Sequence, residues 1–238
     1  MTETPSRRAD MRARIIDVAA RLLREQGPAA VTTRGVAEAA GVQAPAIYRL
    51  FGDKDGLLEA VAEHVMETFV STKAAIVESA SADEVDPLAD LRSGWQTQVD
   101  FGVANPALFR LFSDPDRVRR SPAARSGRRV LESRVHRVAE SGRLRVSERR
   151  AVDLIQAAGI GTIQTLLAAP PEHRDADLAE SMYEAVLRQI LADPPDATTN
   201  GPAAAAVAFR AMTPRLDALT KAERRLLADW LDRVIAGS

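Results

Sequence analysis

One stretch near the N-terminus, residues 32–58, combines residue types and spacings that suit binding to nucleic acid. It reads TTRGVAEAAGVQAPAIYRLFGDKDGLL. Two short helices joined through Gly41-Val42 match a helix-turn-helix, and the glycine suits the turn because it tolerates a positive φ. The first helix turns three small residues inward, which lets the two helices cross closely: Val36, Ala37 and Ala40. The stretch therefore predicts a DNA-binding domain at the start of the chain.

The second of these helices, residues 43–51, has the composition of a helix that enters the major groove. Ile47 and Phe51 are four residues apart and point toward the core. The outward positions hold small or polar residues and one long donor: Gln43, Ala44, Ala46 and Arg49. Because the alanines can contact only thymine methyl groups, we expect specificity to depend on Gln43, Arg49 and DNA shape.

These residues resemble the DNA-binding domain of TetR/AcrR-family regulators. The family pattern is represented here by Thr32, Val36-Ala37, Ala40-Gly41-Val42, Tyr48 to Phe51, Lys54 and Leu57-Leu58. The resemblance covers about residues 8–60, and the rest of the chain resembles the family only as an all-α body of similar length. One position departs from the pattern, because Leu50 stands where the family often has His or Tyr, and this puts one phosphate contact in doubt.

The resemblance implies that eight residues contact DNA: Thr33, Arg34, Gln43, Ala44, Pro45, Tyr48, Arg49 and Lys54. Thr33 and Arg34 begin the positioning helix and meet phosphates or an adjacent base. Residues 43–45 lie at the floor of the groove, and Arg49 reaches a guanine edge or a phosphate. Tyr48 and Lys54 meet phosphates, which set the register of the protein on DNA while base contacts set the sequence.

Several of these residues also have a plainer interpretation. Tyr48 can pack on the first helix, and Arg34 and Arg49 can be solvated charges, since all but three of the 32 basic residues are arginines. Arg7 and Arg8 form either an arm that contacts DNA or a solvated tail.

The elements behind this stretch are predicted from capping signals. Asp53 can cap a long helix from Lys54 to about Ser79. A capping residue directly before proline then marks helix starts at Asp86-Pro87, Asn105-Pro106, Ser121-Pro122 and Thr213-Pro214. We expect helices near 87–104, 106–112, 122–140, 147–168, 175–192, 203–212 and 214–219. The capping box formed by Thr220 and Glu223 predicts a last helix to about Ala236.

The predicted fold is therefore all-α, with a three-helix helix-turn-helix domain followed by a larger helical ligand-binding and dimerisation domain. We assign residues 1–55 to the DNA-binding domain and 56–192 to the regulatory and dimerisation domain. Residues 193–238 form a Pro/Gly/Thr-rich linker at 193–202 and a helical extension at 203–238. The extension is expected either to cap the core or to extend the dimer interface.

A ligand pocket in the body is suggested by four aromatic residues: Trp95, Phe101, Phe109 and Phe112. The plainer interpretation of each is core packing. Four polar residues are either anchors inside such a pocket or solvent-facing side chains: Gln96, Gln98, Asp100 and Gln164.

A dimer interface is expected at residues 147–192. The segment LIQAAGIGTIQTLL at 154–167 is apolar and carries two glycines, which suggests close helix approach. In the family that these residues resemble, the last two helices of the body form a four-helix dimer interface, and the resemblance implies this role here. The alternative is a hairpin within one chain.

Other functional classes have no support in the sequence. The chain has no cysteine, and His64, His136 and His173 are scattered, so we expect no metal, no cofactor and no enzyme activity. A net charge of −1 excludes a globally basic nucleic-acid coat. The longest apolar run, Leu154 to Ala169, is too short for a membrane span, so a cytoplasmic protein is expected.

The predicted function is sequence-specific regulation of transcription by a homodimer bound to a double-stranded DNA operator. We expect a repressor that a small apolar ligand releases from DNA by shifting the population of its conformations. The alternative is a ligand-independent DNA-binding or architectural protein, which would be expected to be more basic.

Overall fold

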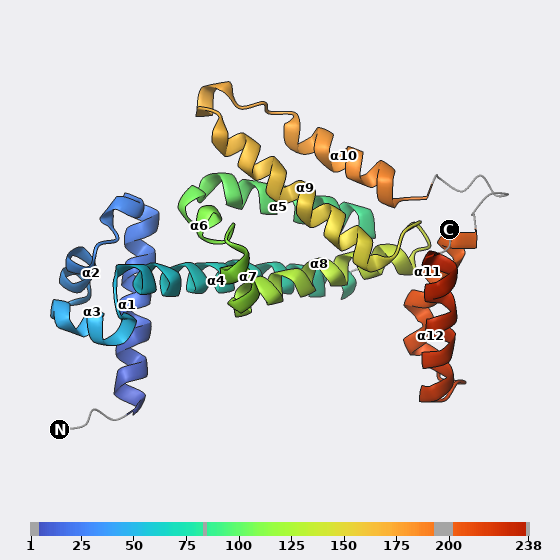
Figure 1. Ribbon diagram of the computed structural model, residues 1–238, viewed down its shortest axis with the longest axis horizontal. Helices are drawn as coiled ribbons and strands as arrows, with labels where there is room; N and C mark the ends of the chain where they lie inside the picture. Colours follow the sequence, from blue (N-terminus) through green and yellow to red (C-terminus); the bar gives the residue numbers. More distant parts are fainter. Residues whose placement is uncertain (1–4, 83–84, 193–201, 237–238) are drawn as a thin grey trace. The chain divides into compact units, whose positions relative to one another are not determined.

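The computed structural model describes residues 5–82, 85–192 and 202–236, and this part of the chain is helical throughout (Figure 1). It forms twelve α-helices and three short 3₁₀ turns, and its sole β-type pairing is a bridge between Leu144 and Leu191. The all-α prediction is therefore confirmed. The predicted linker at 193–202 lies outside the described residues except for Pro202.

The chain divides into two compact units, each made of two separate stretches of the sequence. The N-terminal unit comprises residues 1–72 and 107–127, and the C-terminal unit comprises residues 73–106 and 128–238. The predicted boundary after residue 55 falls inside a continuous helix, α4 (Lys54–Ala82).

The N-terminal unit is built around the predicted helix-turn-helix. It contains α1 (Pro5–Gln26), α2 (Thr33–Ala40), α3 (Ala44–Phe51) and the first part of α4. Apolar residues from all four helices form one core, which includes the fully buried Ile15, Val36, Ile47, Leu57 and Val61. The spacing of three and four residues in α1 and α4 places these side chains on one face of each helix.

The N-terminal unit also contains a segment from the middle of the chain. This segment comprises most of α6 (Pro106–Leu111), α7 (Pro115–Arg120) and the first turn of α8 (Pro122–Glu140). Helix α7 was missed in the sequence analysis, although Asp114-Pro115 repeats the signal used elsewhere. The Asp114 carboxylate accepts a hydrogen bond of 2.8 Å from the backbone N–H of Asp116.

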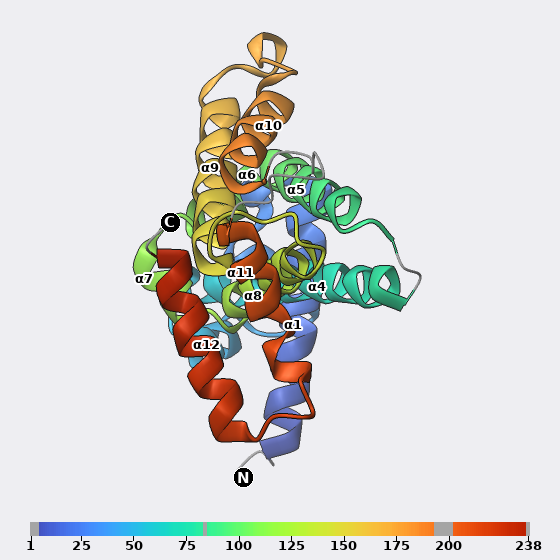
Figure 2. The ribbon, with the colours of Figure 1, turned by 90° about the vertical axis from the view of Figure 1, so that its right-hand side faces the viewer.

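The core of the C-terminal unit is formed by α5 (Pro87–Ala104), α9 (Glu148–Ala168) and α10 (Leu178–Ile190). Figures 1 and 2 both show α9 and α10 side by side. Trp95 of α5 packs on Tyr183 of α10 with ring centroids 5.5 Å apart, and its indole N–H donates to the carbonyl oxygen of Ala179 at 3.0 Å. The two glycines of α9 differ, since a Cβ at Gly159 would lie 3.5 Å from Trp95, whereas one at Gly161 would meet nothing within 4 Å.

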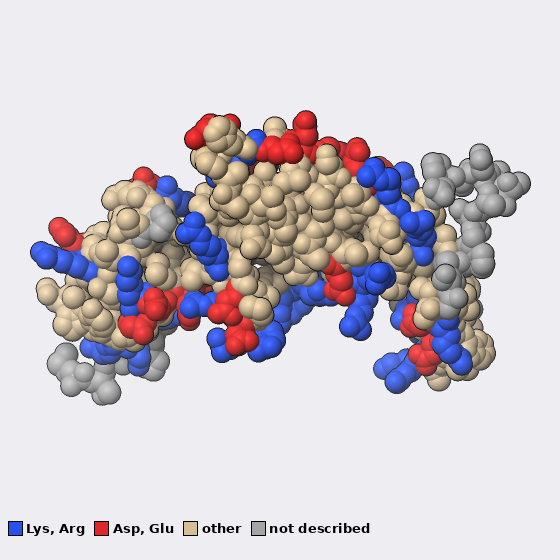
Figure 3. All heavy atoms as spheres, turned by 45° about the horizontal axis from the view of Figure 1, so that its top comes forward, with Lys and Arg blue, Asp and Glu red and all other residues tan. Residues whose placement is uncertain are grey.

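Helix α9 keeps an exposed apolar face. It is 21 residues long and, by length and composition alone, could cross a membrane. Of the apolar 18-residue stretch of the helix that meets this criterion, 39% is buried inside the protein. The apolar run that begins at Leu154 is part of this helix. The side chain of Ile160 is 40% exposed, and Figure 3 shows a broad area without charged side chains in the region of α9.

The C-terminal extension is a helical hairpin of α11 (Pro202–Met212) and α12 (Lys221–Ala236). An ion pair of 3.0 Å between Arg210 and Asp232 joins the two helices. The predicted capping box is confirmed, because the Glu223 carboxylate accepts from the backbone N–H of Thr220 at 2.8 Å. The helix expected at 214–219 is not formed: a 3₁₀ turn covers Thr213–Arg215, and the Thr213 hydroxyl donates back to the carbonyl oxygen of Phe209 instead of capping a new helix.

Candidate nucleic-acid interface

Helix α2 begins at the residue that the sequence indicates. The Thr32 side chain accepts a hydrogen bond of 2.9 Å from the backbone N–H of Gly35, as an N-cap does. The next residue, Thr33, is half-buried and Arg34 is exposed. The start of α2 therefore presents the two residues that the resemblance assigns to phosphate or base contacts.

The turn between α2 and α3 has the conformation that its glycine predicts. Gly41 lies in the left-handed region with φ 64° and ψ 36°, and the backbone N–H of Val42 donates to the carbonyl oxygen of Ala37 at 2.9 Å. The Arg14 guanidinium of α1 donates to the carbonyl oxygen of Ala40 at 3.0 Å. This contact was not anticipated, because it joins residues 26 positions apart. It ties the last turn of α2 to α1.

Helix α3 combines a buried side with an exposed side. Ile47 is completely buried, whereas Tyr48 is 52% exposed and Arg49 is also exposed. Gln43 stands in extended conformation at the N-cap, where its side chain makes no capping hydrogen bond, and Pro45 follows in the first turn. The side chains of Gln43, Tyr48 and Arg49 thus lie on the surface of one short helix, as a groove-reading helix requires.

The tyrosine lies beside the start of α2. Its hydroxyl is 3.5 Å from the hydroxyl of Thr33, which is the outer limit of a hydrogen bond. Because more than half of the Tyr48 side chain remains exposed, the ring does not pack into the core of the unit. Two residues on two helices thus place hydroxyl groups at one point of the surface, where a phosphate oxygen could accept from both.

Four other residues of α3 are half-buried: Ala44, Ala46, Leu50 and Phe51. Ala44 and Leu50 pack against the core of the N-terminal unit, and Ala46 is also partly covered. The packing of Leu50 gives a physical reason for its apolar character. It also leaves Ala44 with less surface for a thymine methyl group than the sequence analysis expected.

Helix α4 begins next to α3. The Asp53 carboxylate accepts from the backbone N–H of Gly56 at 2.7 Å, which confirms the predicted cap. Lys54 is exposed at the first position of the helix, where a phosphate could contact it. Arg7 and Arg8 belong to α1 and are exposed.

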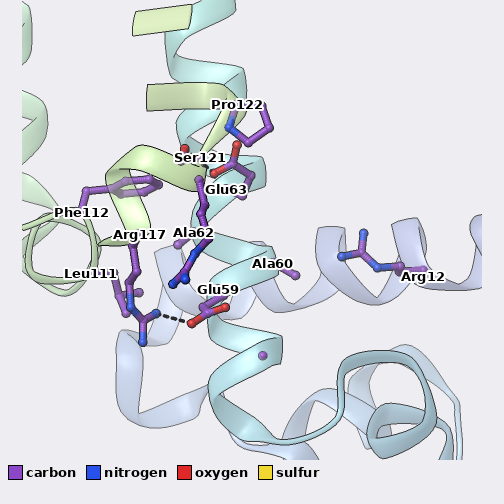
Figure 4. A pocket seen from close by; sticks show the side chains of 12 residues that line it. Arg12, Glu59, Ala60, Ala62, Glu63, Leu111, Phe112, Arg117, Ser121 and Pro122 are labelled. Atoms are coloured by element: carbon purple, nitrogen blue, oxygen red, sulfur yellow. Dashed lines mark hydrogen bonds and ion pairs between the residues drawn. The ribbon is translucent and has the colours of Figure 1, made fainter. Parts of the chain in front are cut away.

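A cavity of about 290 Å³ lies within the N-terminal unit, beside the first part of α4 (Figure 4). Arg117 of α7 forms an ion pair of 2.7 Å with Glu59. The Glu63 carboxylate accepts from the Ser121 hydroxyl at 2.6 Å and from the backbone N–H of Ala123 at 2.7 Å. Side chains of α4 thus hold α7 and the first turn of α8. Sequence reasoning assigned the cap of α8 to Ser121 alone and missed Glu63, which is 58 residues away.

The four aromatic residues proposed for a ligand pocket fall into different units. Trp95 and Phe101 belong to the C-terminal unit, and Phe109 and Phe112 belong to the N-terminal unit. Trp95 is a core residue, 4% exposed against Tyr183. Phe112 lines the cavity beside α4. A shared pocket for these four residues stays a prediction.

Comparison with known proteins agrees with this geometry. A family model described as "Bacterial regulatory proteins, tetR family" matches residues 15–61. The HTH-type transcriptional regulator TtgR of Pseudomonas putida is 40% identical over 83 residues, which are 35% of this chain and 38% of that protein. The nucleoid occlusion factor SlmA of Haemophilus influenzae is 30% identical over 89 residues, which are 37% of this chain and 39% of that protein. The chain thus matches about two fifths of the length of these curated relatives.

Solved structures extend the likeness to the helical body. A TetR-family regulator from Pectobacterium atrosepticum superposes with a TM-score of 0.65 at 19% identity, covering 81% of this chain and 100% of that chain. RolR in complex with resorcinol superposes with a TM-score of 0.62 at 21% identity, covering 87% of this chain and 97% of that chain. FadR of Thermus thermophilus in complex with lauroyl-CoA superposes with a TM-score of 0.61 at 21% identity, covering 79% of this chain and 100% of that chain.

At these identities the likeness shows the fold alone, whereas the match to the tetR family model lies in the N-terminal helices. Taken together, residues 15–61 match the tetR family of bacterial regulatory proteins, and the helices behind them have the fold of a solved TetR-family transcriptional regulator.

Proposed function

We propose that this protein is a repressor that binds a DNA operator as a homodimer in the cytoplasm and is released by a small-molecule effector. The observation that supports this most strongly is the exposed face of α3, where Gln43, Tyr48 and Arg49 surround a buried Ile47. Base edges are read by amide and guanidinium groups, and phosphates are held by hydroxyl and cationic groups. Helix α3 and its neighbours supply all four kinds of group.

The proposed dimer uses α9 and α10. Ile160 is 40% exposed and Gly161 has open space around it, so a second helix could approach α9 closely. A two-fold dimer presents two recognition helices to successive major grooves about 34–36 Å apart. The apolar face of α9 is then an interface between subunits, which explains why a helix of a DNA-binding protein leaves apolar surface exposed.

The effector response is proposed to pass through α4. This helix begins beside α3 and is contacted within the same unit by α7 and α8 through Glu59 and Glu63. A ligand that changes the position of α7 and α8 would thereby move α4. RolR and FadR, which share the fold, have been solved with resorcinol and with lauroyl-CoA, respectively.

The test is fluorescence anisotropy of the purified full-length protein on the DNA that flanks its own gene, measured across a salt series. We expect tight binding that weakens steeply with salt, because phosphate contacts release counterions. Arg49→Ala should weaken binding and relax sequence preference. Arg225→Ala, which removes an exposed arginine from α12, is the matched control and should bind like the wild type. Binding to no fragment in a genome-wide selection would reject the proposal.

A further inference from the structure

The cavity beside the first part of α4 lies within the N-terminal unit. It has a volume of about 290 Å³ and is lined by residues from α1, from α4 and from the segment 111–122. Ligand pockets in proteins begin at about this size. Solvent reaches the lining, because Arg12, Glu59 and Arg120 are exposed residues. A small molecule can therefore enter this cavity from solvent.

The acidic side chains that line the cavity already have partners. Both carboxylate oxygens of Glu63 accept hydrogen bonds, one from the Ser121 hydroxyl and one from the backbone N–H of Ala123. The carboxylate of Glu59 lies 2.7 Å from Nη1 of Arg117. Because both acidic groups are engaged in this way, the cavity holds no unpaired carboxylate that would attract a cation.

The three arginines that line the cavity are held differently. The guanidinium group of Arg12 lies 5.3 Å from the centre of the Phe51 ring, and Figure 4 shows this side chain apart from Arg117. Within the described residues, the guanidinium group of Arg120 forms no hydrogen bond and no ion pair. Arg117 and Arg120 are three residues apart on α7, which places them on the same side of that helix. Arg120 therefore offers unpaired donors next to a second guanidinium group.

Arg117 also has unused donors. Its Nη1 is paired with Glu59 and its Nε lies 3.4 Å from Asp114, so these contacts involve two of its three nitrogens. A guanidinium group carries five N–H donors in one plane, an arrangement that fits a carboxylate. The Glu59 side chain is 52% exposed, so it can turn toward solvent. A carboxylate from solvent can therefore join or replace Glu59 at Arg117.

The lining near these arginines is apolar. Leu111 and Phe112 precede α7 in the sequence and Pro122 follows it, and all three line the cavity. Figure 4 shows Leu111 and Phe112 beside Arg117. These side chains offer van der Waals contacts and no hydrogen bonds. The cavity thus suits a molecule that combines one acidic group with an apolar body.

We propose that Arg117 and Arg120 bind the carboxylate group of a small organic acid, whose apolar part contacts Phe112. As an effector site this cavity rests on the proposed function, and its ligand differs from the apolar molecule that the sequence analysis expected. A carboxylate is favoured over a phosphate dianion, because Glu59 and Glu63 also line the cavity and repel a second negative charge.

The small number of phenylalanines provides a direct readout. The chain has six, and Phe112 alone among them lines the cavity. Full-length protein is labelled with 4-fluorophenylalanine, and the ¹⁹F NMR signal of Phe112 is assigned from its absence in Phe112→Leu. The signals of the other phenylalanines serve as internal references. The protein is titrated with benzoate, acetate, benzyl alcohol or phenyl phosphate in sodium chloride at equal ionic strength.

We expect benzoate to shift the Phe112 signal until the site is saturated. Acetate, which lacks the ring, should bind more weakly, and benzyl alcohol, which lacks the charge, should leave the signal unshifted. An equal response to benzyl alcohol would show that the cavity does not select an anion. Tighter binding of phenyl phosphate than of benzoate would overturn the carboxylate assignment. If no probe shifts the Phe112 signal, the site itself is refuted.

Removal of the unpaired guanidinium group tests the role of Arg120. Arg120→Gln should raise the Kd for benzoate roughly tenfold or more, with circular dichroism to verify that the protein is folded. Arg119→Gln is the matched control, because Arg119 is exposed, pairs with Asp116 and is not part of the lining. The control should bind benzoate like the wild type. An equal loss in both variants would show a general effect of charge and contradict a specific site.

Removal of the competing carboxylate should have the opposite effect. Glu59→Gln frees Arg117 and removes a negative charge from the cavity, so it should lower the Kd for benzoate roughly twofold or more. Glu67→Gln removes an exposed carboxylate of α4 that is not part of the lining, and it should leave the Kd unchanged. Weaker binding of benzoate to Glu59→Gln would mean that the ligand needs this carboxylate, which contradicts an acidic ligand.

The NMR readout requires no DNA, so the acid site and the proposed function fail independently. If benzoate binds beside Phe112 but the protein binds no operator, the function is wrong and the site stands. If the operator is bound but the Phe112 signal responds to no probe, the regulator stands and the acid site is wrong.

Discussion

The carboxylate of Glu63 accepts the hydroxyl hydrogen of Ser121 at 2.6 Å, and its second oxygen accepts from the backbone N–H of Ala123 at 2.7 Å. A side chain of α4 thus caps the first turn of α8. Since α4 begins directly after α3, the proposed recognition helix, this contact joins two stretches of the N-terminal unit that lie 58 residues apart in the sequence.

Removing this cap should loosen α8. Glu63→Ala is expected to reduce the free energy of unfolding by about 1–2 kcal/mol, because it removes the cap and leaves the buried Ser121 without its acceptor. Urea denaturation followed by circular dichroism measures the change. Glu67→Ala removes an exposed carboxylate one turn further along α4 and is the matched control. An equal effect of both variants would exclude a specific role for Glu63.

The Tyr48 hydroxyl is expected to contact a phosphate and not a base. Tyr48→Phe should therefore weaken operator binding by about 1 kcal/mol, similarly for all sequences. Gln43→Ala should instead change the preferred sequence, because Gln43 lies at the N-terminal end of α3, which is proposed to enter the major groove. Fluorescence anisotropy with a set of operator variants distinguishes the uniform loss of affinity from the change of sequence preference. A change of sequence preference with Tyr48→Phe would contradict the phosphate assignment.

The exposed face of α9 should hold the dimer together. Ile160→Asp is expected to shift the protein from dimer to monomer, since it places a charge in the middle of an apolar interface. Size-exclusion chromatography with light scattering measures the mass. Leu226→Asp makes the same change at a residue of α12 that is 47% exposed, and we expect it to leave the dimer intact. A monomer in the second case would show that the C-terminal extension belongs to the interface.

Lys73 should make stability depend on pH in the alkaline range. Its pKa is about 8 in the folded protein, against an ordinary value of 10.5 for a solvated lysine, so the unfolded chain binds more protons between these values. The free energy of unfolding therefore increases as the pH rises from about 8 toward 10, and Lys73 causes no such increase below about pH 8. Burial is the larger cause of the lowered pKa of Lys73, and the positive charge of Arg134 lowers it further.

The comparison with Lys73→Met isolates this contribution. The variant should be more stable than the wild type near pH 7, and the difference should shrink as the pH rises above 8. Chemical denaturation at a series of pH values gives both curves. Parallel curves for the two proteins would mean that Lys73 is not the group responsible.

Local sequence signals predicted most of the helices because they act over a few residues. Thr32, Asp53 and the Thr220–Glu223 box cap helices where expected, and Gly41 has the positive φ that its turn requires. The same signal at Asp114-Pro115 marks α7, which was nevertheless overlooked. The signal at Thr213-Pro214 proved misleading, because the threonine side chain found its acceptor on the preceding turn.

What the sequence alone determined was therefore most of the helices, the helix-turn-helix and the exposure of Gln43 and Arg49 on its outer face, since periodicity and caps depend on neighbours within one or two turns. Only the tertiary structure decided which distant groups meet. Glu63 reaches Ser121 across 58 residues, and Arg134 reaches Asp90 across 44. No local pattern encodes such pairs, because hydrogen bonds between helices depend on how the helices pack.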